Sequence, residues 1–267
     1  MKKSIVLCAD DFGQAPAINN AILQLCQLKR LSAVSCLVTM DHWQRDAKKI
    51  GAFANQVDIG LHFNLTEGEA LTSAWCNRPL KNLLLAAYAR ALPAQLIEAE
   101  LNAQIDVFVA SEQNLPNFID GHEHIHQLPV IREILLKVYK ARFSGRKTYI
   151  RSAFFSHPRS FKQLAINVLG GAKFSQLLKK NSIPHNCSFA GAYNLSPRSD
   201  YARLFCQFLQ RVNHRGLIMC HPGAESSNDR IAGVRSNELA YFMSENFLQD
   251  CLKYNVSISR FEEAFIV

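Results

Sequence analysis

The chain has 267 residues, of which 48% are hydrophobic and 19% are charged, a globular composition that excludes extensive disorder. Its eight cysteines include no C-x-x-C pair, which argues against a zinc ribbon and a short-loop disulfide framework, so we expect reduced, packed thiols. The formal net charge is +8, but the basic residues form small groups without interleaved aromatic residues, so we expect no nucleic-acid partner.

The first residues carry no sign of an export signal. Met1-Lys2-Lys3 precedes only six small or apolar residues, and two aspartates follow them. No apolar run along the chain has the length of a transmembrane span. We therefore expect a soluble, cytoplasmic protein without a transmembrane segment.

In chain order, strand-like apolar runs alternate with helical patterns. Strands are predicted at 5–9, 33–40, 57–63 and 117–120, and helices at 17–28, 42–54 and 128–139. This alternation predicts a parallel sheet. Between residues 70 and 115 it is interrupted by a turn-rich stretch, 72–79, and two amphipathic helices, 80–91 and 93–110. We interpret 70–115 as a helical insertion that could form a lid.

The second half continues the pattern. We predict a strand at 148–155, helices at 161–169 and 172–180, a turn at 189–193, a helix at 200–211, a strand at 216–220, a closing helix at 236–254 and a last strand at 256–259. No internal repeat is present, and no linker is long enough to separate two domains. We therefore expect one α/β domain over residues 1–267.

Four short motifs rich in aspartate or histidine each follow a predicted strand. They are Ala-Asp-Asp-Phe-Gly at 9–13, Gly-Leu-His-Phe-Asn at 60–64, Asp-Gly-His-Glu-His-Ile-His at 120–126 and Cys-His-Pro-Gly at 220–223. In α/β barrels and open parallel sheets, functional residues converge at the carboxyl ends of the strands. The motifs therefore predict one divalent-metal site.

The first motif places two carboxylates side by side. Because side chains alternate along a strand, we expect Asp10 and Asp11 to point to different sides, so that one binds a metal while the other accepts a proton. A bland alternative is that Asp11 caps the helix that follows.

The histidines offer candidate ligands. His62 ends an apolar run after Gly60 and is followed by Asn64 and Thr66, which favours a polar cavity over a packed core, although a lone histidine here would usually be structural. In the third motif, an extended backbone would put His122, His124 and His126 on one face, whereas a helical start would pair His122 with His126. Imidazole is a preferred ligand of first-row metals, and Asp120 could accept the proton of a ligating imidazole.

His221 follows an apolar strand and precedes Pro222-Gly223. A strand-terminal turn would explain this placement without a function. Its similarity to the other motifs favours a general acid.

Taken together and in this order, the four motifs resemble those of the YdjC-like carbohydrate deacetylases, which include chitooligosaccharide deacetylases and hopanoid-biosynthesis-associated enzymes. A looser match lies at 235–238. The resemblance implies an irregular (β/α) barrel related to polysaccharide deacetylases. This chain departs from the chitooligosaccharide deacetylases at Gly121 and Glu123, which leaves the substrate open.

The resemblance also implies roles for individual residues. The divalent cation would be held by Asp11, His62 and His122. Asp10 would be the general base and His221 the general acid. Arg151 would contact substrate, and it joins Asp120, His124 and His126 as substrate-binding or supporting residues.

The expected activity is metal-dependent removal of N-acetyl groups from an amino-sugar carbohydrate. The family favours magnesium, while one carboxylate and two imidazoles suit Zn, Co, Ni or Mn at least as well. Hydrolysis of another amide or of a phosphoester stays open, as does a non-catalytic glycan-binding protein, although that protein would not need Asp10 and His221. An N-acetylated carbohydrate is the expected partner, and a homodimer stays open.

Overall fold

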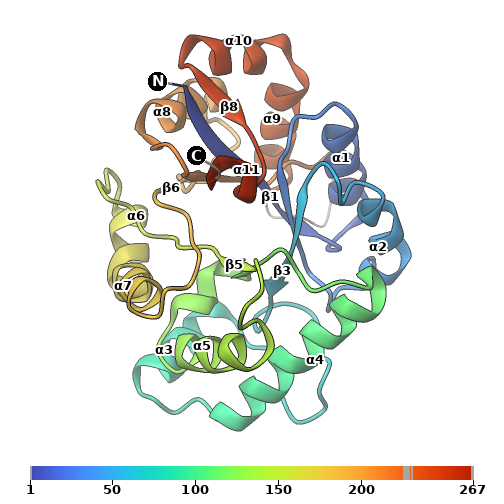
Figure 1. Ribbon diagram of the computed structural model, residues 1–267, viewed down its shortest axis with the longest axis vertical. Coiled ribbons are helices and arrows are strands. Elements are labelled where there is room, and N and C mark those ends of the chain that lie inside the picture. The colour runs from blue at the N-terminus through green and yellow to red at the C-terminus, as the bar shows by residue number, and fades with distance from the viewer. Residues whose placement is uncertain (1, 225–228, 230, 266–267) are drawn as a thin grey trace.

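The computed structural model describes residues 2–224, 229 and 231–265, and its described strands form one parallel sheet (Figure 1). The strands are β1 (Lys3–Phe12), β2 (Ala33–Cys36), β3 (Asp58–Phe63), β4 (Phe118–Gly121), β5 (Tyr149–Ile150), β6 (Phe189–Ala190), β7 (Leu217–Cys220) and β8 (Val256–Ile258). Their order is β5-β4-β3-β2-β1-β7-β6, and β8 pairs with β1.

Helices surround this sheet in Figure 1. They are α1 (Pro16–Gln27), α2 (Trp43–Gly51), α3 (Leu80–Tyr88), α4 (Ala94–Glu112), α5 (Ile131–Arg142), α6 (Phe161–Ile166), α7 (Ala172–Lys180), α8 (Tyr201–Arg211), α9 (Ala232–Met243), α10 (Glu245–Lys253) and α11 (Phe261–Phe265). Two irregular turns, η1 (His122–Gln127) and η2 (Asn167–Gly171), complete the list. The ring of helices around a curled parallel sheet confirms the predicted irregular (β/α) barrel.

The barrel is open between its edge strands β5 and β6. The side chain of Asn186 links the two sides: its Oδ1 accepts the Ser152 N–H at 2.8 Å, and its Nδ2 donates to the carbonyls of Ser152 and Ser188 at 2.9 Å each. These bonds satisfy backbone groups that would otherwise stay unpaired at the edges. They hold the open barrel in shape.

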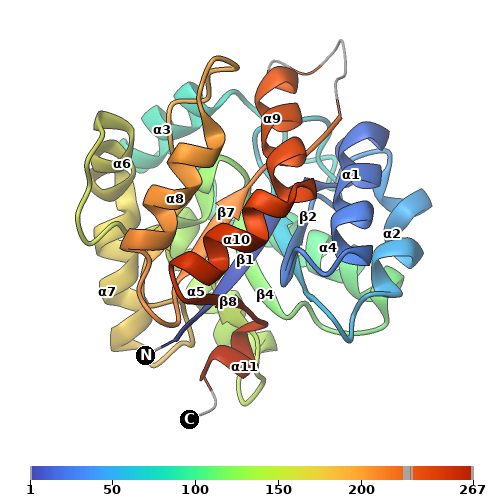
Figure 2. The same ribbon diagram turned by 90° about the horizontal axis from the view of Figure 1, so that it is seen from above.

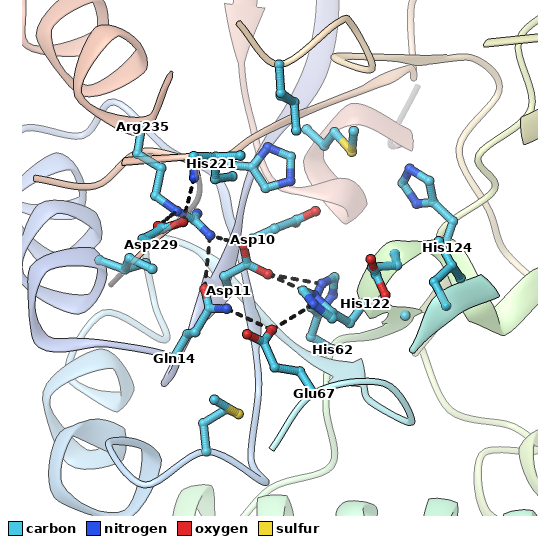
Figure 3. Close-up of a pocket in the computed structure, with 18 of the residues that line it drawn as sticks. Asp10, Asp11, Gln14, His62, Glu67, His122, His124, His221, Asp229 and Arg235 are labelled. Carbon is cyan, nitrogen blue, oxygen red and sulfur yellow. Dashed lines mark hydrogen bonds and ion pairs between the residues drawn. The ribbon is translucent and has the colours of Figure 1, made fainter. Parts of the chain in front are cut away.

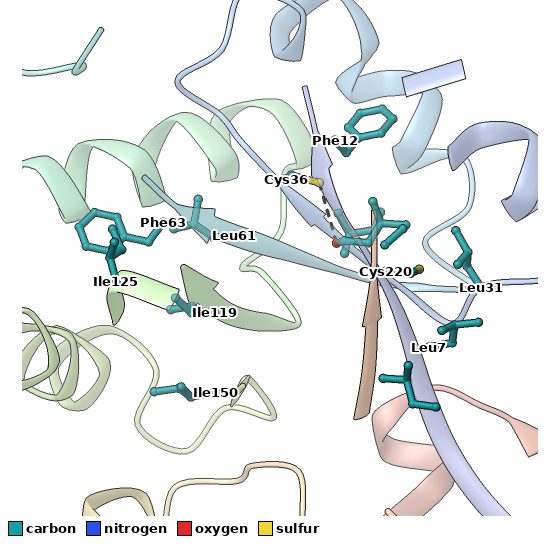
Figure 4. Packing of buried hydrophobic residues seen from close by; sticks show 14 of the residues in the cluster. Leu7, Phe12, Leu31, Cys36, Leu61, Phe63, Ile119, Ile125, Ile150 and Cys220 are labelled. Atoms are coloured by element: carbon teal, nitrogen blue, oxygen red, sulfur yellow. Dashed lines mark hydrogen bonds between the residues drawn. The ribbon is translucent and has the colours of Figure 1, made fainter. Parts of the chain in front are cut away.

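Alternation along the strands separates an outer core from an inner one. On β1, Ile5 and Leu7 pack outward with residues of the helices, whereas Val6 and Cys8 point into the barrel. Figure 4 shows part of the outer cluster. Inside, Gly60 makes room for Phe118, because a Cβ at residue 60 would lie 2.5 Å from the Phe118 ring. The interior of the barrel is therefore filled mainly by apolar side chains.

The C-terminal segment covers the opposite end of the barrel. The Phe261 ring stacks on Tyr149 with centroids 3.8 Å apart, and its N–H donates to Asp58 Oδ2 at 2.8 Å. Arg260 pairs with the same carboxylate at 2.8 Å. Figure 2 shows α11 and both termini at one end of the molecule. The C-terminal segment therefore does not cover the carboxyl ends of the strands, where the cavity described below lies.

Several predicted elements differ from the structure. The strand expected at 148–155 is only Tyr149–Ile150. The strand expected at 33–40 ends at Cys36, after which Leu37 N–H bonds the Phe12 carbonyl at 2.7 Å. The turn expected at 189–193 contains the short strand β6. The closing helix expected at 236–254 is two helices, because Ser244 is extended (φ −79°, ψ 160°) and its hydroxyl donates to the Tyr241 carbonyl at 2.7 Å.

The segment 70–115, expected as a helical insertion and lid, divides into two parts. Helix α4 lies between β3 and β4 in the chain and packs on both α2 and α5 as a barrel helix, with Phe108 stacked on Trp43 at 5.7 Å. Helix α3 lines the cavity described below through Leu80 and Leu84. Among the described residues, no helix is both long and apolar enough to cross a bilayer.

Candidate metal centre

The four sequence motifs meet at one cavity of about 760 Å³ at the carboxyl ends of the strands (Figure 3). Asp10 and Asp11 come from β1, His62 from β3, His122 from the turn after β4, and His221 from the end of β7. A volume of this size is within the range of small-molecule sites. The cavity is the candidate functional site.

Asp11, His62 and His122 form a group of potential metal ligands at the wall of this cavity. Each residue offers one ligand atom, and these atoms all lie within 4.8 Å of one another. Asp11 Oδ1 lies 3.1 Å from His122 Nδ1 and 3.5 Å from His62 Nε2. One carboxylate and two imidazoles leave coordination positions for water and substrate, as a catalytic divalent cation requires.

Asp120 and Ser35 orient the imidazole of His62 through its Nδ1 atom. Its Nδ1 lies 2.6 Å from Asp120 Oδ1 and 2.9 Å from Ser35 Oγ, and the Ser35 hydroxyl donates to the same carboxylate oxygen at 2.6 Å. With the proton on Nδ1 shared with Asp120, the lone pair on Nε2 faces Asp11. This is the arrangement that fixes a ligating imidazole in metal sites, so the residues present fit a divalent cation.

Both aspartates line the same cavity, which corrects the expectation that they point to different sides. The pairing of β1 with β2 is irregular between Ala9 and Phe12, and Asp11 has a left-handed backbone with φ of +70°. These two features break the alternation that a regular strand would impose. Asp11 does not cap α1 either, since that helix begins after Ala15 without a side-chain cap.

Arg151 holds Asp10 from inside the barrel. Its Nη1 donates to Asp10 Oδ2 at 2.7 Å and its Nη2 to Asp10 Oδ1 at 2.5 Å, while Nη2 also pairs with Asp120 Oδ2 at 2.6 Å. Burial acts to raise the pKa of Asp10, but the guanidinium outweighs it and lowers that pKa to about 2. Asp10 is therefore ionised at neutral pH.

The position of Arg151 differs from the expected substrate contact. Its side chain is fully buried and does not line the cavity. Cys8, Asp10 and Asp120 would by themselves form a second group able to hold a metal, but Arg151 Nη2 lies 3.0 Å from Cys8 Sγ and pairs with both carboxylates. The guanidinium already supplies the cation that these groups need.

The 120–126 segment follows neither of the two predicted geometries. Glu123 and His124 have left-handed backbones (φ of 52° and 60°), which turn successive histidines in different directions. His122 faces Asp11, His124 lines the cavity, and His126 is buried with Nε2 at 3.0 Å from the Arg151 carbonyl. His126 thus belongs to neither group of potential ligands.

Gly121 permits this turn. A Cβ at residue 121 would lie 2.9 Å from His126 Nδ1, closer than any side chain could tolerate.

Several polar neighbours of the ligand group were not predicted from the sequence. Glu67 Oε2 lies 3.0 Å from His122 Nε2 and accepts a hydrogen bond from Gln14 Nε2 at 2.8 Å. Burial acts to lower the pKa of His122, but Asp11 and Glu67 together raise it to about 10. The alternating polar residues Asn64 and Thr66, which lead from His62 to Glu67, were the available signal.

Arg235 pairs with the carboxylate of Asp11, as Arg151 pairs with that of Asp10. Its Nη2 donates to Asp11 Oδ2 at 2.7 Å and to Gln14 Oε1 at 2.9 Å, and its Nε pairs with Asp229 at 2.5 Å. Burial acts to raise the pKa of Asp11, and Arg235 with His122 holds it well below its usual range. Both aspartates are therefore ionised, each with its own arginine.

His221 completes the wall of the cavity. Its backbone N–H donates to Glu238 Oε2 at 2.5 Å, and Glu238 Oε1 accepts the Tyr193 hydroxyl at 2.7 Å. Its Nδ1 has no hydrogen-bond partner among the described residues. Burial lowers the pKa of His221 to about 4, against the opposing effect of Asp11 and Asp10, so the imidazole is neutral at neutral pH.

A family model described as "YdjC-like protein" matches residues 4–253. The chain belongs to this family. It is 30% identical over 149 residues to a carbohydrate deacetylase of Danio rerio, covering 51% of this chain and 46% of that protein, and so spans about half the length of that relative. It is 26% identical over 233 residues to a chitooligosaccharide deacetylase of Escherichia fergusonii, covering 83% and 82%.

Solved structures support the fold of this YdjC-like protein. A proposed cellobiose-phosphate cleavage protein of Enterococcus faecalis V583 superposes with a TM-score of 0.76 at 16% identity, covering 98% of this chain and 99% of that one. A peptidoglycan N-acetylglucosamine deacetylase superposes with a TM-score of 0.54 at 9% identity, covering 98% and 88%. The barrel is thus similar to that of a polysaccharide deacetylase, as the sequence predicts.

Proposed function

We propose that this YdjC-like protein is a metal-dependent hydrolase that removes N-acetyl groups from an amino-sugar carbohydrate. The observation that carries the proposal is the cluster of Asp11, His62 and His122 at the wall of a cavity that also holds the ionised carboxylate of Asp10. The printed names of two relatives, a carbohydrate deacetylase and a chitooligosaccharide deacetylase, favour an acetylated sugar as substrate.

Asp11, His62 and His122 are the residues that would hold the cation. When bound there, a divalent cation polarises an amide carbonyl and lowers the pKa of a water molecule. The donor set suits Zn, Co, Ni or Mn, and magnesium is the family expectation. Asp120 and Ser35 keep Nε2 of His62 directed at this position.

Asp10 and His221 would move the protons. Water adds to the amide carbonyl as Asp10 takes one of its protons, and the C–N bond then breaks to release acetate and the sugar amine. Asp10 starts in the required ionised state because Arg151 holds it there. His221 starts neutral, so it has to take up a proton before it protonates the leaving amine, and both neighbouring aspartates favour that uptake.

Metal binding tests the assignment of ligands. Asp11→Asn, His62→Ala and His122→Ala should each weaken the binding of added divalent metal in calorimetry, while the circular dichroism spectrum stays that of the wild type. Asp106→Asn is a matched control that should bind metal as the wild type does, since Asp106 pairs with Arg142 and belongs to no ligand group. Wild-type affinity in all three ligand variants would refute the site.

A further inference from the structure

Helix α3 carries apolar residues on its buried face, on its cavity face and on part of its exposed face, where Lys81 and Asn82 are its polar residues. Leu83 is fully buried in the core, and Leu80 and Leu84 line the cavity. The remaining face carries Leu85 and Tyr88, whose exposed fractions are 65% and 49%. The exposed surface of a helix in a globular protein is normally polar, whereas here it includes two large apolar side chains.

The segment formed by α6 and η2 shows the same feature. Phe161, Leu164 and Val168 follow one another at helical spacing, and their exposed fractions are 87%, 49% and 71%. In a surface helix of a globular protein, such a stripe faces the core. Here the stripe faces solvent, while Ile166 and Leu169 line the cavity.

These two apolar faces are neighbours at the rim of the cavity. The Tyr88 hydroxyl donates to the Val168 carbonyl at 3.4 Å, and both segments contribute to the cavity wall. Figure 2 shows α3 and α6 close together at one side of the molecule. We call the exposed residues here the rim patch, which consists of Leu85, Tyr88, Phe161, Leu164 and Val168. Clustered exposed apolar residues of this kind mark interaction surfaces.

The charge of the residues around the rim patch favours one kind of partner over another. Residues 70–97 and 134–199 contain no aspartate or glutamate, although they include α3, α6 and η2. Lys81, Arg159 and Lys173 are exposed within or beside these segments. A second copy of the chain would bring the same positive surface into contact with itself, which is unfavourable. An anionic partner is complementary.

We propose that the rim patch docks on an anionic lipid bilayer. Exposed Phe and Leu side chains would enter the boundary between headgroups and acyl chains, while the lysines and arginines contact the anionic headgroups. Docking in this way brings the mouth of the cavity against the membrane surface. This binding requires neither a metal nor catalysis, so it stands independently of the proposed function.

Co-sedimentation of the full chain with lipid vesicles tests the proposal. The wild type should bind vesicles of phosphatidylcholine and phosphatidylglycerol more strongly than vesicles of phosphatidylcholine alone, and added salt should weaken that binding. The double variant Phe161→Ser with Val168→Ser should bind the anionic vesicles at least about tenfold more weakly, because it removes two inserting side chains. Both positions are exposed, so the fold and thermal unfolding should be unchanged.

Leu252→Ser provides the matched control. Leu252 is 80% exposed on α10 and is followed by Lys253, and Figure 1 places α10 away from α3 and α6. This control should bind vesicles as the wild type does. The proposal is overturned if the wild type does not bind anionic vesicles, or if Leu252→Ser and the double variant lose binding equally. It is also overturned if light scattering shows a dimer that the double variant dissociates while vesicle binding is unchanged.

Discussion

Arg151→Met removes the guanidinium that pairs with Asp10 and Asp120 inside the barrel. Methionine keeps an unbranched side chain, so the main change is the loss of charge and of its hydrogen bonds. Removing one partner of a buried ion pair costs about 3–5 kcal/mol, because the other charge stays buried without compensation. Two fully buried carboxylates lose the same partner here, so we expect a loss of about 5 kcal/mol at neutral pH, a large part of a typical domain's stability.

The loss should depend on pH in a defined direction. In the wild type, the lowered pKa of Asp10 adds stability that is present above its usual pKa of 3.8 and is lost as the pH falls towards 2. In the variant, burial acts on Asp10 without Arg151 and raises that pKa. The folded variant then binds a proton that its unfolded chain has released, so its deficit should shrink as the pH falls from neutral towards about 5.

Urea unfolding of the metal-stripped proteins, followed by circular dichroism at neutral pH and at about pH 5, measures both effects. Arg151→Lys is a useful comparison, since it keeps the charge but not the two-pronged contact with Asp10, and it should lose less stability than the methionine variant. A loss below about 1 kcal/mol at neutral pH, or a loss that does not change with pH, would refute the reasoning.

Three further predictions concern single residues. Asp10→Asn should retain metal in calorimetry while acetate release falls about a hundredfold or more, since an amide cannot accept the proton; normal turnover would move the base elsewhere. Asp120→Asn should weaken metal affinity about 10–100-fold because His62 loses the carboxylate that fixes its tautomer, and wild-type affinity would contradict this role. Burial lowers the pKa of His126 from 6.5 to about 4, so the unfolded chain binds a proton that the folded one does not, and stability should fall as the pH drops through that range. His126→Gln should lose less over the same range in urea unfolding, and equal slopes would argue against a buried neutral imidazole.

The positions of the motifs along the chain predicted that the four motifs meet at one site, and the resemblance to the YdjC-like family singled out Asp11, His62 and His122 within them. Each follows a strand or ends one, and parallel strands bring their carboxyl ends to the same edge. Asp120 was predicted to accept the proton of a ligating imidazole, and the structure places it beside His62, its register partner on the neighbouring strand. Local sequence patterns are therefore enough to predict which segments of the chain form the site.

The directions of side chains at irregular positions of the backbone could not be predicted from the sequence in the same way. Asp11 departs from strand alternation through a left-handed residue and a change of register, and both depend on how β1 meets β2. Arg151 lies next to a short strand whose position inside the barrel is set by its neighbours, so its approach to Asp10 is a tertiary feature. The sequence does not distinguish Ser35 from other strand residues, because its position beside His62 follows from the arrangement of the strands in the barrel.

Helix α3 shows a different limit of prediction from the sequence. Its pattern predicted a helix, but leucines face the core, the cavity and solvent alike, so the pattern alone did not assign a face to each leucine. The exposed Leu85 becomes notable only when the fold shows that nothing in the described chain covers it.

Acetate release from N-acetylated chitooligosaccharides tests the central claim most directly. The protein is stripped of metal, assayed, and assayed again after separate additions of Zn, Co, Ni, Mn and Mg, with Asp11→Asn treated identically. We expect no release from the stripped protein, restored release with at least one cation, and no restoration in Asp11→Asn, which lacks the carboxylate that contacts both His62 and His122. Equal release with and without metal, or full restoration in Asp11→Asn, would contradict a metal-dependent deacetylase built on this site.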